Sequence, residues 1–153
     1  MLKLRTRSAD ETKRIGSRIG KILKAGDVVT LEGGLGAGKT TMVKGLARGL
    51  GVKSDKKVLS PTFVLVHEYP GREKVFHIDW YRLKEVSGAD AHLAEECFGS
   101  QGVTLVEWPE RGRDLLPKEA LKIRVAHQGG DKRLIQISAK SGRGLEILGK
   151  IKP

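Results

Sequence analysis

Apolar and polar positions at the start of the chain alternate in a way that predicts a short strand followed by a helix. The strand covers residues 2–6, where leucines alternate with basic residues. Ser8 and Glu11 have the spacing of a capping box, which predicts that a helix begins there. Gly26 and Asp27 are expected to end it, and its apolar residues share one face: Ile15, Ile19, Ile22 and Leu23. We therefore expect this helix to pack on the core.

The rest of the chain predicts further strands in alternation with helices. Strand-like runs cover 28–31, 63–69, 75–80, 103–106, 121–126 and 134–138. Residues 70–73, Pro-Gly-Arg-Glu, are a hairpin signal, so one antiparallel pair is expected inside or beside a mainly parallel sheet. Helices are expected after Lys39 as far as Gly51, over 85–97 and over 144–151, with an exposed loop at 53–57.

A glycine-rich segment joins the strand-like run at 28–31 to the next predicted helix. It matches the pattern G-x-x-x-x-G-K-[ST] of a P-loop in its strand–turn–helix context, and it consists of Gly33, Gly34, Leu35, Gly36, Ala37, Gly38, Lys39, Thr40 and Thr41. The glycines let backbone N–H groups point at an anion, and the helix dipole adds positive potential. We expect Lys39 to reach the β- and γ-phosphates of a nucleotide and Thr40 to bind Mg²⁺.

With this segment at its centre, the pattern predicts an α/β chain with a three-layer P-loop NTPase fold. Helices would flank a mixed, mainly parallel β-sheet, and a length of 153 residues suits a single domain over 1–153. No apolar run is long enough to span a membrane, and the start is too charged for a signal peptide, so a cytoplasmic location is expected. Cys97 is the only cysteine, which excludes an internal disulfide and a thiolate-rich zinc site. It is expected to be a half-buried thiol.

Nucleotide hydrolysis also needs an acid for the metal shell and a group that orients water. Glu107 follows a four-residue strand and Asp79 follows another, so each is expected at the carboxyl end of its strand, where α/β sheets bind ligands. The spacing does not say which of them faces the metal. For each, a rim carboxylate paired with a basic residue is the alternative.

Two other polar residues lie near these strands. Thr62 follows a proline and stands where a threonine can sense a γ-phosphate in nucleotide switches, although the position suits an ordinary strand residue equally well. His77 is expected on the sheet face opposite Ile78, where a satisfied structural role is favoured over catalysis or metal binding.

The formal net charge of +11 raises the possibility of an acidic partner, nucleic acid above all. However, the positive residues are spread along the chain, and only seven aromatic residues are present to stack on bases. A solvated basic surface is about as compatible with the composition. We therefore expect the isolated protein to bind RNA only weakly and without selectivity.

Three alternative functions differ in chemistry. Residues 138–140, Ser-Ala-Lys, resemble the base-reading corner of small GTPases, but the guanine-specifying Asn-Lys-x-Asp is absent, so ATP is the expected nucleotide. A nucleotide-dependent module that holds RNA through its basic surface is a second alternative. A small-molecule kinase is the third, although no lid segment with arginines is evident.

Four motifs in order resemble the bacterial TsaE family, formerly called YjeE. They are residues 34–41, residues 60–63 (Ser-Pro-Thr-Phe), residues 77–83 (His-Ile-Asp-Trp-Tyr-Arg-Leu) and residues 106–110 (Val-Glu-Trp-Pro-Glu). The resemblance extends from the N-terminal helix to about Ile137. It implies a small, slow ATPase needed for threonylcarbamoyladenosine in tRNAs that read codons starting with A. It also implies TsaB and TsaD as the partners that carry the transfer, with tRNA reached through their complex.

The same resemblance implies roles for individual residues. Lys39 and Thr40 would contact phosphate and Mg²⁺, Glu107 would be the metal-shell acid, Asp79 would act near the γ-phosphate, and Thr62 would belong to a switch loop. Trp108 is a family position without a role that we can derive. The chain departs from the family pattern at Cys97, where an aromatic residue is usual, at Leu93, where glycine is common, and in the tail after residue 137.

Overall fold

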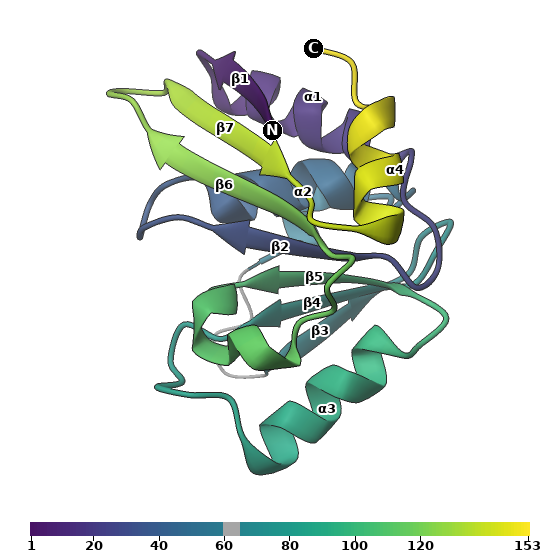
Figure 1. Cartoon of the computed structure of the whole chain (residues 1–153). Helices are drawn as coiled ribbons and strands as arrows, with labels where there is room; N and C mark the ends of the chain where they lie inside the picture. Colours follow the sequence, from purple (N-terminus) through teal and green to yellow (C-terminus); the bar gives the residue numbers. More distant parts are fainter. Residues whose placement is uncertain (60–64) are drawn as a thin grey trace.

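A single mixed sheet forms the centre of the computed structural model, which describes residues 1–59 and 65–153. Figure 1 shows its seven strands, in the spatial order β1-β7-β6-β2-β5-β4-β3. Their bounds are Leu2–Thr6 (β1), Val28–Glu32 (β2), Val66–Tyr69 (β3), Val75–Asp79 (β4), Val103–Glu107 (β5), Leu121–His127 (β6) and Arg133–Ser138 (β7). The neighbours β6, β2, β5 and β4 are parallel, whereas β7 and β3 run against their neighbours. The predicted hairpin is confirmed as the β3–β4 edge.

Helices cover the sheet on both faces and make the predicted three layers (Figure 1). Their bounds are Ala9–Gly20 (α1), Lys39–Gly49 (α2), Gly88–Phe98 (α3) and Gly142–Lys150 (α4), with 3₁₀ segments at Asp55–Lys57 (η1) and Pro109–Leu115 (η2). One apolar core lies between the sheet and α1, α2 and α4, and a second lies beneath α3 and η2. No helix among the described residues is long and apolar enough to cross a membrane.

Glycines bring α1 and α2 into close contact on the first face of the sheet. A Cβ added at Gly16 would lie 2.9 Å from Cα of Gly45, and one added at Gly20 would lie 2.9 Å from Cα of Gly49. Real Cβ atoms do not approach so closely, so any side chain at these positions would force the helices apart. Because α2 begins at the glycine-rich loop, this contact fixes the direction in which the loop opens.

The ends of α1 differ in how well they were predicted. Its start is confirmed, because the Glu11 N–H donates to Oγ of Ser8 at 3.1 Å, and the Glu11 carboxylate accepts from the Arg7 N–H at 2.7 Å. The helix ends at Gly20, before Ile22 and Leu23, which continue as a turn. Both side chains still face the core, so the apolar pattern predicts their burial correctly, but the predicted helix is too long.

The segment before α3 also departs from the prediction. The Val86 N–H donates to the Arg111 carbonyl at 3.0 Å, and the Val86 side chain packs in the second core, so the residues before Gly88 stay outside the helix. Cys97, near the end of α3, is only 5 % exposed rather than half-buried. Burial raises the pKa of its thiol.

Candidate nucleotide site

The loop between β2 and α2 holds a conformation that requires glycine. Gly33, Gly36 and Gly38 have φ values of 151°, 71° and 106°, in the region that residues with a Cβ rarely adopt. A Cβ on Gly33 would also overlap the carbonyl oxygen of Val125. Gly38 is the N-cap of α2, so the positive end of that helix opens onto the loop at the carboxyl end of β2. This geometry suits an anion.

Lys39 lies across the mouth of the loop. Its ammonium group donates to the carbonyl oxygens of Gly33 at 2.6 Å and Gly34 at 2.8 Å, and it lies 4.4 Å from the centre of the Trp108 ring. Burial lowers the pKa of Lys39, and the nearby carboxylates, Glu107 foremost, oppose that shift. A bound phosphate would act in the same direction as these carboxylates and favour the charged lysine.

The two candidate acids lie side by side at the carboxyl ends of neighbouring strands. The β4–β5 register pairs Asp79 with Glu107. Glu107 is 2 % exposed, and its Oε1 accepts a hydrogen bond from the Thr40 hydroxyl at 3.3 Å. Asp79 is more exposed and accepts from the Tyr81 N–H at 2.9 Å. The structure therefore brings Glu107, rather than Asp79, next to the threonine expected to bind metal.

A cavity of about 470 Å³ joins these groups into one site. This volume lies in the range of small-molecule pockets. Most of the predicted phosphate loop lines it together with both acids, and the full lining is Leu35, Gly36, Ala37, Gly38, Lys39, Thr40, Thr41, Asp79, Tyr81, Glu107, Trp108 and Arg133. Gly33 and Gly34 do not line the cavity, but their carbonyl oxygens accept hydrogen bonds from Lys39, and Thr62 lies outside the described residues.

A buried histidine contacts Glu107, one of the two candidate acids. Nε2 of His77 donates to Oε2 of Glu107 at 2.6 Å, and Nδ1 lies 3.3 Å from the Tyr69 hydroxyl. His77 is fully buried on the face opposite Ile78, as predicted. The two-residue strand period places residues 77 and 79 on one face of β4, but the sequence alone does not show that β5 is the neighbouring strand, so the contact between His77 and Glu107 was not predicted.

Trp108 and Arg133 complete the site, and the sequence alone predicts a role there for neither residue. Trp108 has φ 58°, the only positive value for a non-glycine residue in the described chain, and its ring centre lies 5.0 Å from that of Tyr81. Arg133, on β7, donates from Nε to the Ala37 carbonyl at 2.7 Å. Nothing local in the sequence marks Arg133, since it is 96 positions away from Ala37.

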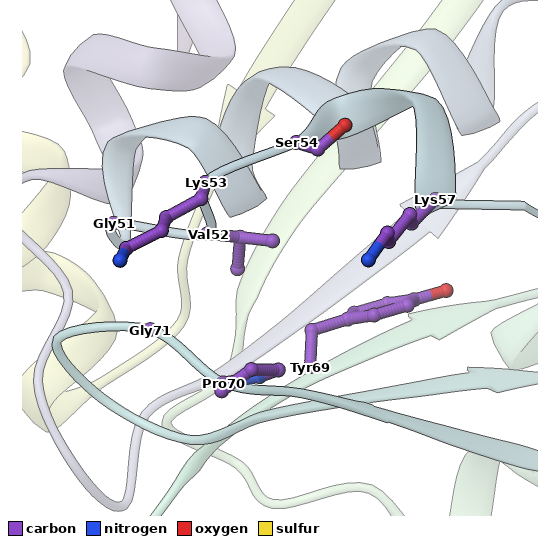
Figure 2. A pocket seen from close by; sticks show the side chains of 8 residues that line it. All are labelled: Gly51, Val52, Lys53, Ser54, Lys57, Tyr69, Pro70 and Gly71. Atoms are coloured by element: carbon purple, nitrogen blue, oxygen red, sulfur yellow. The ribbon is translucent and has the colours of Figure 1, made fainter.

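A second cavity, of about 450 Å³, lies at the other end of α2 (Figure 2). It is bordered by Gly51 and Val52 after the helix, by Lys57 of η1 and by Tyr69 and Pro70 near the β3–β4 turn. An eleven-residue helix spans about 16 Å, which separates this cavity from the phosphate loop. It contains none of the predicted site residues.

Comparison with known proteins identifies close relatives. Residues 6–135 match the protein family described as threonylcarbamoyl adenosine biosynthesis protein TsaE. The tRNA threonylcarbamoyladenosine biosynthesis protein TsaE of Bacillus subtilis is 45 % identical over 143 residues, covering 93 % of this chain and 88 % of the relative. That of Treponema pallidum is 43 % identical over 118 residues, covering 77 % and 86 %. The crystal structure of Bacillus subtilis YdiB has a TM-score of 0.80 at 38 % identity and covers 98 % of this chain and 93 % of that one.

Proposed function

The chain belongs to the TsaE family, which serves tRNA threonylcarbamoyladenosine biosynthesis, and from this premise we propose that it is a Mg²⁺-dependent ATP-binding protein with slow ATPase activity. The observation that carries the proposal is the convergence of Lys39, Thr40 and Glu107 on one cavity at the N-terminus of α2. These are the three kinds of group that P-loop NTPases use for phosphate and metal.

The residues present fit a magnesium ion held together with a nucleotide. The Thr40 hydroxyl and Oε1 of Glu107 are hard oxygen ligands only 3.3 Å apart. Among the described residues, no group of three or more histidine, cysteine or acidic side chains could hold a metal by itself. This fits Mg²⁺, which is usually held by one or two carboxylates with waters and substrate phosphates. When bound, the ion would neutralise charge on the transferred phosphate.

The protein groups would divide the remaining work. Backbone N–H groups of the loop and Lys39 would hold the phosphates, and their fixed charge would stabilise negative charge that develops during hydrolysis. Asp79, which lines the cavity, would act near the γ-phosphate, and the family resemblance implies that Thr62 belongs to a switch loop. His77 occupies Oε2 of Glu107 and leaves Oε1 toward Thr40, so we assign it as the residue that positions this acid.

The protein would act on a protein assembly that modifies tRNA, and the state of its bound nucleotide would control this action. We propose TsaB and TsaD as the partners, on the basis of the family resemblance. Purification of the tagged protein from cells tests this proposal. Recovery of both partners supports it, whereas recovery of tRNA without either protein would instead favour an RNA-binding module.

ATP is expected to bind in preference to GTP. The chain has no Asn-Lys-x-Asp segment to supply a carboxylate to the guanine donors. In a competition assay with labelled ATP and Mg²⁺, unlabelled ATP should displace the label at concentrations at least about tenfold lower than GTP, a difference of roughly 1.4 kcal/mol. Displacement by GTP at equal concentration would restore the GTPase alternative.

Replacement of His77 tests its positioning role. We expect His77→Phe, which keeps the buried ring, to lower ATP turnover about 10- to 100-fold, the usual effect of losing a group that orients a metal ligand. It should also raise the Mg²⁺ concentration needed for half-maximal turnover. Tyr69→Phe is the matched control, because it removes the hydroxyl beside Nδ1 of His77, which also donates to the Leu59 carbonyl, and keeps the contact between Nε2 of His77 and Glu107. A His77 variant that is folded and has unchanged turnover and Mg²⁺ dependence would rule the role out.

A further inference from the structure

One face of the sheet is uncovered and basic at its β1-β7-β6 end. The residues of this basic sheet face point away from α1, α2 and α4, and they are Lys3, Arg5, Lys122, Arg124, Ala126, Leu134, Gln136 and Ser138. Figure 1 shows β6 and β7 in front of α1 and α2, with no helix on the near side. The registers place Lys3, Gln136 and Arg124 in one row across the three strands.

Strand alternation explains why the cations gather there. Leu2 and Leu4 of β1 face the first core, and so do the isoleucines of β7, which leaves the intervening residues on the opposite face. Lys3, Arg5 and Arg124 are exposed and Lys122 is partly exposed. Residues that are about 120 positions apart in the chain therefore form a single patch.

The patch has little compensating negative charge. Among the described residues, no carboxylate forms an ion pair with any of its four cations. Glu32 of β2 is paired with Arg124 in the strand register and marks the border. By contrast, α3 covers the β5–β4 end of the same sheet face, and it carries Asp90, Glu95 and Glu96 and no lysine or arginine. The net charge is thus distributed unevenly.

The patch continues at its β2 edge into a polar cavity of about 290 Å³. Its charged lining consists of Arg113, Lys118, Lys122 and Lys140 together with Glu32 and Asp114. Thr30 also lines it, and its hydroxyl is buried without a hydrogen-bond partner among the described residues. The cavity adds cations and an unused polar group to the border of the basic sheet face.

We propose that the basic sheet face binds the phosphate backbone of RNA, with tRNA as the physiological RNA. Protein partners rely on buried aromatic or aliphatic anchors, and the face offers only Leu134 and Ala126. It has no aromatic residue on which a base could stack, whereas Gln136 and Ser138 are side chains of the kind that contact phosphate and sugar. Binding through this face is therefore independent of base sequence. The proposal does not depend on the proposed ATPase activity.

A salt titration of binding to an unmodified tRNA transcript tests the proposal. Four phosphate contacts should make log affinity fall with log salt with a slope of roughly −3, so that affinity drops about 50-fold between 50 and 200 mM. In the variant K3Q/R5Q/K122Q/R124Q, we expect affinity at 50 mM salt to fall at least tenfold and the slope to flatten by about 3. An unrelated RNA hairpin should behave like tRNA.

The matched control removes the same charge from elsewhere on the surface. The variant R14Q/K21Q/K24Q/K150Q changes exposed cations outside this face, and it should retain the wild-type slope. Equal losses in both variants would show that net charge alone attracts RNA, and no loss in the first would exclude this face. Undetectable binding of the wild type at 50 mM salt would also overturn the proposal. ATP affinity, measured in parallel, should be unchanged in both variants, which separates this result from a failure of the nucleotide site.

Discussion

Lys39→Ala is expected to weaken ATP binding at least 100-fold, which in practice abolishes it in calorimetry. Lys39 is 5 % exposed, and its ammonium group donates hydrogen bonds to two carbonyl oxygens of the loop. The phosphate oxygens of a bound nucleotide would replace these acceptors or add to them. Hydrogen bonds to charged groups contribute about 1.5–3 kcal/mol each, so loss of contacts with two phosphates amounts to about 3 kcal/mol or more. Lys44→Ala, on the same helix but outside the cavity, is the control and should bind ATP normally. Unchanged affinity and turnover in the Lys39 variant would refute the phosphate-loop interpretation.

The same lysine predicts how ATP affinity depends on pH. Because burial lowers the pKa of Lys39 in the free protein, the charged form is disfavoured there, and a bound phosphate shifts the pKa upward again. The affinity for ATP should therefore be highest below the lowered pKa of Lys39 and should decline as the pH rises through that pKa. The Lys39→Ala variant, measured over the same range, should lack this decline.

Glu107→Gln is expected to lower ATP turnover about 100-fold while ATP affinity changes no more than a few-fold. Removal of a group that stabilises charge only in the transition state commonly costs 10²–10³ in rate, or about 3–4 kcal/mol. Glutamine has the size of Glu107 and can still form hydrogen bonds with Thr40 and His77. The substitution therefore leaves no cavity beside these two residues. Calorimetry with ATP and Mg²⁺, followed by single-turnover hydrolysis, separates binding from chemistry.

Asp79 provides a comparison on the neighbouring strand. Asp79→Asn should also damage turnover more than binding, but it should change the Mg²⁺ dependence less, because Asp79 does not share the hydrogen bond with Thr40. A Glu107 variant that lost affinity and turnover equally would show that this acid serves ground-state binding. Normal turnover in both variants would remove the two carboxylates from the proposed mechanism.

The local sequence was sufficient to predict the order of strands and helices along the chain, the glycine-rich turn between β2 and α2 and the positions of both acids at strand ends. These features depend on residues a few positions apart, whose spacing is set by the 3.6-residue helix period and the two-residue strand period. Errors occurred where a distant contact decided the outcome. The segment before α3 is held out of the helix by the Arg111 carbonyl and by packing in the second core, and neither is visible in the residues around Val86.

Only the tertiary structure decided which groups meet. The order of strands in the sheet placed His77 against Glu107, and the return of the chain through β7 placed Arg133 against the phosphate loop. The order of strands also placed Lys3 and Arg124 in one row with Gln136, whereas in the sequence these cations are far apart. Side-chain chemistry and periodicity are local properties of the sequence. The neighbours of a strand are instead chosen by burial and backbone pairing across the whole sheet, and those neighbours determine the partners of each polar group.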